Sequence, residues 1–311
     1  MMNWPRALSE GVRTATRQGR LVIPLAIAEL CAILLAMAPR LFVSARILAA
    51  VHALAQPTSA AGALAGVLDA AADPSTWVIV ALGAAAALAG AFLVRTVVEA
   101  GALGPVAEQL GRAAPVEPDA FLPSVLGHTA RYLATRTLAM LLELFALVCI
   151  GGAVVSGMRM MRTTPGVGAA FAMTLATLSV LALPFTLAAL EVGFARSVLL
   201  GESPVAALAG GFAIAVKRWE ALVPAWAAYA IADGAVVFAL VVADIAIAAA
   251  APGSAAGLLL LLPVAAALFA FAYARGAVSL ARLATLAAFV GEDEGTYPPA
   301  PEPVFQAVAV A

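Results

Sequence analysis

Six long apolar runs divide this chain, and they constrain its fold more than any other feature of the sequence. Each run reaches or nearly reaches the roughly 20 residues that an α-helix needs to cross about 30 Å of hydrocarbon. Only 11% of the residues are charged, whereas a soluble domain carries about 25%. We therefore predict an all-α membrane protein with six transmembrane helices. The predicted spans are residues 21–38, 77–94, 137–157, 167–190, 221–243 and 256–274.

The basic residues between the runs predict how the helices are oriented. Thirteen of the 17 arginine and lysine residues fall on the side that would hold both chain ends, and four fall on the other side. Basic residues accumulate on the cytoplasmic side of membrane proteins. The distribution therefore predicts that both termini face the cytoplasm. Because the chain is also rich in alanine, glycine and arginine, we expect a multi-pass protein of a bacterial inner membrane.

The segments outside the runs have their own patterns. Residues 40–55 and 121–135 are amphipathic, which favours helices that lie in the membrane interface. Residues 100–131 contain four prolines, so we expect a loop there that interrupts any long helix. The acidic, proline-rich residues 291–311 predict a disordered cytoplasmic tail. The remaining residues, 1–290, then form one transmembrane domain.

Two stretches of the sequence resemble each other and indicate an internal repeat. GVRTATRQGRLVIP (11–24) and GFAIAVKRWEALVP (211–224) share a first glycine, a basic seventh residue and a final proline. Both stretches lead into an apolar run. We therefore expect three hairpins of like orientation, each entered from a basic interfacial helix, as in a parallel membrane repeat.

The second stretch also shows a resemblance to a known family. The junction GESPVAALAGGFAIAVKRWEALVP (201–224) resembles the corresponding segment of bacterial six-helix membrane proteins, most of them uncharacterised. Those proteins are related to the membrane domain that precedes some glycerophosphodiester phosphodiesterases. The resemblance implies a six-span topology and no catalytic residues, because the phosphodiesterase domain of that family is a separate soluble module.

Acidic residues inside the apolar runs are the strongest candidates for a functional site. Glu29, Glu143 and Asp233 lie in the first, third and fifth runs. A charge in hydrocarbon costs about 2.5–3.5 kcal/mol even on insertion scales, so such a residue needs a role. Three roles are open: proton-coupled transport, hydrogen bonds that hold helices together, and pairing with a counter-ion. The candidate counter-ions are Arg95, Arg136 and Arg275.

Basic residues at the cytoplasmic ends of the runs form a second candidate site. Contact with anionic lipid headgroups would contribute about 1 kcal/mol per cation. The alternative is that these residues only set the topology. They are Arg17, Arg20, Arg131, Arg136, Lys217 and Arg218.

The sequence contains no pattern typical of a catalytic or cofactor site. It has no metal-ligand spacing of cysteine and histidine, no GxSxG and no phosphate-binding glycine loop. The net charge of −1 provides no field that would attract nucleic acid. We therefore predict a non-enzymatic, cofactor-free membrane protein that binds membrane lipids or another membrane protein, as a subunit or scaffold. The alternative is a small permease or proton-coupled transporter that uses the three intramembrane carboxylates.

Overall fold

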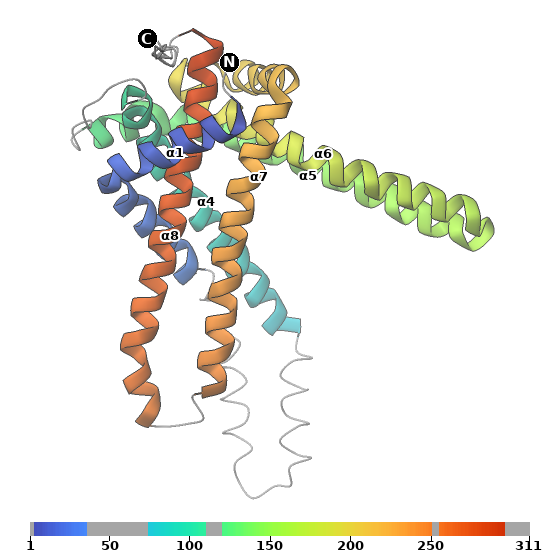
Figure 1. Cartoon of the computed structure of the whole chain (residues 1–311). Helices are drawn as coiled ribbons and strands as arrows, with labels where there is room; N and C mark the ends of the chain where they lie inside the picture. The colour runs from blue at the N-terminus through green and yellow to red at the C-terminus, as the bar shows by residue number, and fades with distance from the viewer. Residues whose placement is uncertain (1–2, 36–73, 110–119, 251–254, 296–311) are drawn as a thin grey trace, which may run out of the picture. The chain divides into compact units, whose positions relative to one another are not determined.

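The computed structural model describes residues 3–35, 74–109, 120–250 and 255–295 (Figure 1). All regular structure in these ranges is helical. A short helix, α1 (Trp4–Arg17), is followed by the helix Gly19–Leu35. The long helices are α4 (Pro74–Gln109), α5 (Phe121–Thr163), α6 (Pro165–Leu199), α7 (Pro204–Ala250) and α8 (Ala255–Asp293).

The five long helices contain segments that are long and apolar enough to cross a membrane. Helix α1 and the helix Gly19–Leu35 are separated by a bend and add a sixth span if they are counted together. The predicted all-α class is confirmed for the described part of the chain, and its helices fit a multi-pass membrane protein. The five candidate spans are Ala81–Glu108, Phe121–Thr163, Pro165–Leu199, Pro204–Leu240 and Val264–Asp293.

The helices extend beyond the predicted apolar runs. Helix α4 continues through Pro105 to Gln109, so the prediction of a loop from residue 100 is wrong in this part. Helix α5 begins at Phe121, in agreement with the amphipathic pattern, but it continues without a break through the apolar run. Residues 40–55, the other predicted interfacial helix, lie outside the described residues.

Packing between α4 and α5 explains why Pro105 does not end α4. A Cβ atom on Gly101 would overlap the side chains of Val125 and Phe121, so the two helices approach closely at this glycine. The Ser124 hydroxyl donates a hydrogen bond to the Ala100 carbonyl at 3.2 Å. These tertiary contacts stabilise helical turns that the local sequence disfavours.

The chain separates into two compact units. The first unit comprises Met1–Gly19, Ala100–Ala232 and Val278–Ala311, and the second comprises Arg20–Glu99 and Asp233–Ala277. Helices α4, α7 and α8 each contribute residues to both units.

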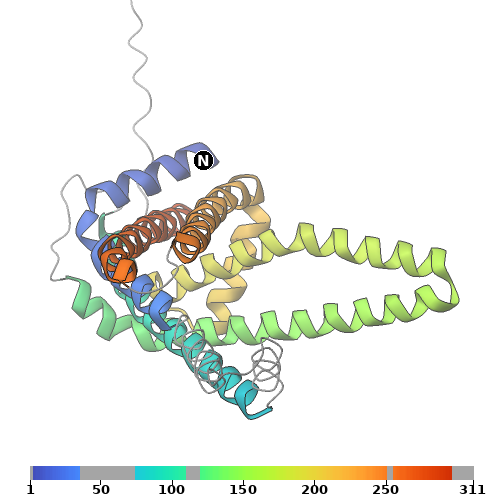
Figure 2. The same cartoon turned by 90° about the horizontal axis from the view of Figure 1, so that it is seen from below.

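The buried core of the first unit lies toward the helix ends. The buried side chains in the first half of α5 extend as far as Ala139. Those in the second half of α6 start at Ala188. Between them, no described side chain of residues 140–156 or 169–187 is buried. Figure 2 shows α5 and α6 as two long arms that run antiparallel and meet at a turn. Exposed apolar side chains over such a length are typical of a surface that faces lipid or a membrane partner.

Both copies of the internal repeat use their shared glycine for close helix packing. A Cβ atom on Gly11 would overlap Thr285 and Tyr229, so α1 lies directly against α8 and α7. A Cβ atom on Gly211 would overlap the Ala189 carbonyl oxygen of α6. Glycine at the first position of the repeat therefore permits two helices to approach closely in each copy.

The eighth residue of each copy interrupts a helix. Gln18 has φ −102° and ψ 36° and follows the last residue of α1. Arg218 has φ −132° and ψ 28°, and it marks a kink inside α7. In both copies a short helix is thus separated from the apolar helix that follows it.

Candidate functional sites

Four charged side chains from four helices form a chain of ion pairs within the second unit. Glu29, on the helix Gly19–Leu35, accepts a hydrogen bond from Arg95 Nε of α4 at 2.7 Å. Its other carboxylate oxygen lies 3.0 Å from Nη1 of Arg275 on α8. Arg275 also donates from Nε and Nη2 to the two carboxylate oxygens of Asp233 on α7, at 2.7 and 3.0 Å. We call these four residues the four-helix charge cluster.

The four-helix charge cluster is electrically balanced, with two carboxylates and two guanidinium groups. Glu29 is only 3% exposed, so its charge needs partners to offset the loss of water. The bidentate contact between Arg275 and Asp233 is the strong form of such a pair. Of the three roles left open by the sequence, these contacts correspond to pairing with Arg95 and Arg275.

A glycine next to the cluster explains how α8 reaches Glu29. A Cβ atom on Gly276 would lie 2.8 Å from the Ala26 nitrogen, closer than side chains tolerate. The backbones of α8 and the helix Gly19–Leu35 therefore approach closely beside Arg275. This packing, and not the spacing of charges in the sequence, selects the partner of Glu29.

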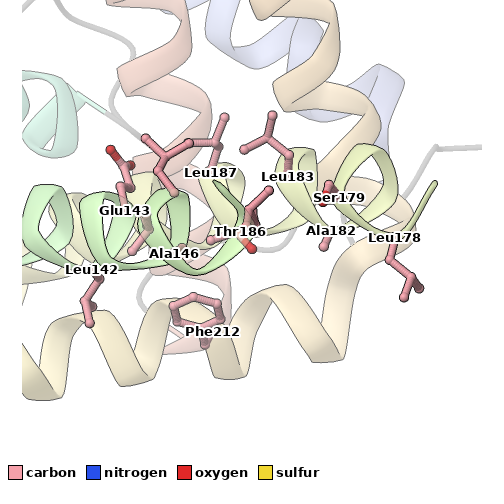
Figure 3. Close-up of a pocket in the computed structure, with 13 residues that line it drawn as sticks. Leu142, Glu143, Ala146, Leu178, Ser179, Ala182, Leu183, Thr186, Leu187 and Phe212 are labelled. Atoms are coloured by element: carbon pink, nitrogen blue, oxygen red, sulfur yellow. The ribbon is translucent and has the colours of Figure 1, made fainter. Parts of the chain in front are cut away.

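The third predicted acid, Glu143, belongs to the first unit and lines a pocket between α5 and α6 (Figure 3). The pocket has a volume of about 410 Å³, within the range of about 300–1,000 Å³ that is usual for small-ligand sites. Its wall is apolar except for Glu143, Ser179 and Thr186. The lining residues are Leu142, Glu143, Ala146, Leu147 and Ile150 of α5, Leu178, Ser179, Ala182, Leu183, Thr186, Leu187 and Leu190 of α6, and Phe212 of α7.

The polar groups of this pocket make no hydrogen bonds to other residues within the described part of the chain. Glu143 is attracted by the charge of Arg136, two helical turns earlier on α5, but makes no hydrogen bond to a described residue. The hydroxyls of Ser179 and Thr186 make none either. The guanidinium carbon of Arg136 lies 5.9 Å from the ring centre of Phe194, a distance typical of a cation–π contact. The pocket therefore offers one carboxyl and two hydroxyls to a ligand.

Two of the predicted headgroup-binding cations lie in ion pairs with the end of α8. Lys217 Nζ lies 2.7 Å from an oxygen of Asp293, and Arg218 donates to Glu292. Glu294, which follows Asp293 in the sequence, contacts Arg196 at 3.0 Å. We call Glu292, Asp293 and Glu294 the α8 acidic end. The sequence-based interpretation missed this site, although three consecutive acids and three nearby cations were the signal that could have indicated it.

The α8 acidic end also changes where the predicted tail begins. Helix α8 ends at Asp293, so residues 291–293 are helical, while the chain from residue 296 lies outside the described residues.

Arg196 contacts two acids. Besides Glu294, it contacts Glu202, which accepts hydrogen bonds from its Nε at 3.0 Å and its Nη2 at 2.5 Å. The cations of this junction are therefore neutralised by acids of the same unit.

The other four predicted cations have different surroundings. Arg17, Arg20 and Arg131 are exposed and form no ion pair with a residue in the described ranges. Arg136 lies over Phe194, as described above. The three exposed arginines thus remain the candidates for contact with anionic headgroups.

No three histidine, cysteine, aspartate or glutamate side chains gather into a metal-binding arrangement among the residues that the structure describes. Comparisons of the chain with models of protein families, with curated proteins and with solved structures find no match. The resemblance to the membrane domain that precedes some glycerophosphodiester phosphodiesterases therefore stays a prediction from the sequence.

Proposed function

We propose that this protein is a non-enzymatic integral membrane protein that binds the apolar chain of a membrane lipid between α5 and α6. The observation that supports this function is the apolar pocket of about 410 Å³ in Figure 3. The arms around it expose apolar side chains, among them Phe145, which is 69% exposed. A molecule that reaches the pocket across such a surface comes from the lipid phase and not from water.

The position of the pocket along α5 matches the depth of an acyl chain. At 1.5 Å per residue, Arg136 and Arg159 are separated by about 35 Å, close to the thickness of a hydrocarbon core. Arginines at both ends of such a segment would reach the two interfaces. On the same scale the α5 residues that line the pocket lie about 9 to 21 Å from Arg136. This range lies in the middle of the segment, at the depth of lipid acyl chains.

We place the protein in a bacterial inner membrane, with its six apolar segments forming three hairpins and both termini in the cytoplasm. The distribution of the basic residues supports this orientation. The candidate spans in α4 to α8, together with the bent pair at the start of the chain, supply six segments.

The alternative, a proton-coupled transporter, would use Glu29, Glu143 and Asp233 as one set. Glu29 and Asp233 accept hydrogen bonds from arginines, which occupy oxygen positions that a substrate would need. Glu143 belongs to the other unit. The contacts therefore favour a structural role for two of these acids and lipid binding at the third.

The proposed function is tested with a lipid whose acyl chain carries a photoreactive diazirine. Irradiation of the protein in vesicles that contain this lipid should label the α5 and α6 peptides that line the pocket. Ala182→Phe fills the pocket and should reduce this labelling about tenfold, which corresponds to about 1.4 kcal/mol.

The matched control is Ala176→Phe, because Ala176 is also exposed and lies on α6 outside the pocket lining. This variant should be labelled like the wild-type protein. Equal labelling of the Ala182→Phe variant and the wild-type protein, or labelling of other helices alone, would contradict lipid binding in the pocket.

A further inference from the structure

The pocket between α5 and α6 contains a single ionisable side chain, and that side chain is acidic. Among its lining residues there is no lysine, arginine or histidine, and Glu143 is accompanied only by the hydroxyls of Ser179 and Thr186. Figure 3 shows Glu143 on one arm and both hydroxyl residues on the other. A ligand in this pocket therefore meets hydrogen-bond acceptors on both sides.

We infer that the pocket selects a single-chain lipid with a small polar end that donates a hydrogen bond, such as a long-chain alcohol or amine. The inference rests on the proposed function and adds the class of ligand. A donor that reaches Glu143 forms a charge-assisted hydrogen bond, which is about twice as strong as a neutral one. Ser179 and Thr186 accept or donate as the ligand requires.

An anionic polar end is disfavoured at the same position. A carboxylate or phosphate beside the Glu143 carboxylate would be repelled, and in an apolar surrounding this repulsion is weakly screened. The nearest cation on α5, Arg136, attracts Glu143 itself, is not among the residues that line the pocket, and lies over the ring of Phe194. No basic group inside the pocket is available to offset the charge of an anionic ligand.

The depth of Glu143 limits the size of the polar end. Glu143 lies seven residues beyond Arg136, about 10 Å along the helix. A phospholipid whose phosphate stays near Arg136 at the interface presents only its acyl chains at this depth. A long-chain alcohol or amine has a polar end small enough to enter the apolar region, where an unpaired polar group needs a partner.

The experiment compares two diazirine probes of equal chain length, a fatty alcohol and a fatty acid, on the full chain in vesicles. The alcohol should label the pocket peptides at least about fivefold more than the acid. Glu143→Leu should reduce labelling by the alcohol about tenfold and remove the preference. Glu143→Gln should keep most of the labelling, because an amide oxygen still accepts a hydrogen bond.

The results distinguish a failure of the inferred ligand class from a failure of the proposed function. If Ala182→Phe blocks both probes but the acid labels the wild-type pocket as well as the alcohol does, the ligand class is wrong and lipid binding stands. Unchanged alcohol labelling of the Glu143→Leu variant also overturns the ligand class. If Ala182→Phe blocks neither probe, the proposed function itself fails. Thermal melting of the two Glu143 variants should match that of the wild-type protein, since Glu143 makes no hydrogen bond in the described chain.

Discussion

Arg275 contacts the carboxylates of both Glu29 and Asp233, and no other residue of the four-helix charge cluster contacts both acids. Its loss would leave Asp233 without its bidentate partner and Glu29 with Arg95 alone. Breaking a buried ion pair by removing one partner costs about 3–5 kcal/mol, because a buried charge remains uncompensated. The fractional exposure of the Asp233 side chain, 34%, moderates this cost because water reaches that carboxylate.

We therefore expect Arg275→Leu to lower the free energy of unfolding by about 3 kcal/mol. The measurement is thermal or denaturant unfolding of the purified protein in one detergent. Arg159→Leu is the control, since Arg159 is exposed near the turn of the α5–α6 hairpin and surface changes usually stay within about 0.5 kcal/mol. Identical unfolding midpoints for the two variants would show that the cluster does not stabilise the second unit.

At this scale the sequence identifies the acids but not their partners. Glu29 and Asp233 stand out because each is a charge within an apolar run, where burial requires compensation. Three arginines were equally plausible partners, since their distance to an acid depends on helix packing. The close approach of α8 at Gly276 determines which arginine reaches Glu29, and no local pattern in the sequence reports that approach.

Among the elements, the helices follow from the apolar runs, whereas their ends do not. Runs of about 20 apolar residues predict helices because every backbone polar group must be satisfied within the membrane. The ends of α4 and α8 are set by tertiary contacts instead: Ser124 and Gly101 hold α4 against α5. The α8 acidic end is in turn held by cations of α6 and α7. Local sequence patterns therefore predict that these helices exist, but they predict the ends of the helices wrongly.

Replacing all three residues of the α8 acidic end (Glu292→Gln, Asp293→Asn and Glu294→Gln) should release the last turns of α8. The pair of Lys217 is exposed, and those of Arg196 and Arg218 are partly buried. Exposed pairs contribute about 0.2–1 kcal/mol each, so we expect a modest loss of global stability and a larger local effect. Amide hydrogen exchange in the last turns of α8 should become faster by about tenfold. High salt should have a similar effect on the wild-type protein, because it screens these pairs.

The matched control for this variant is Glu108→Gln, which removes one acid near the end of α4 instead. Exchange in α8 should be unchanged in this control. If exchange in the triple variant is also unchanged, packing of the apolar side chains of α8 and not its ion pairs would hold the helix end in place.

At the largest scale, within the first unit, buried side chains lie in α5 up to Ala139 and in α6 from Ala188, while the arms between these positions expose apolar side chains. Cys149 tests whether the arms lie in lipid. It is a free cysteine, exposed in the structure, and it lies 13 residues beyond Arg136, about 20 Å along α5. A thiol in hydrocarbon does not form the reactive thiolate.

A water-soluble maleimide should therefore label Cys149 at least tenfold more slowly in membrane vesicles than after denaturation. Cys31→Ser provides the background in which only this thiol is measured. Arg159→Cys should be labelled from the periplasmic side and Ser203→Cys only from the cytoplasmic side. Rapid labelling of Cys149 in intact vesicles would show that this arm is in contact with water.

The distribution of buried residues along α5 and α6 has a consequence for how a molecule enters between them. The arms are anchored at one end by the core around Ala139 and Ala188, and at the other by contacts such as that of Gly157 with Phe171. Midway, no described side chain of the two arms is buried. If the protein binds a lipid chain as proposed, we therefore expect the chain to enter and leave between the two arms from the side that faces the bilayer, while both ends of the arms stay packed.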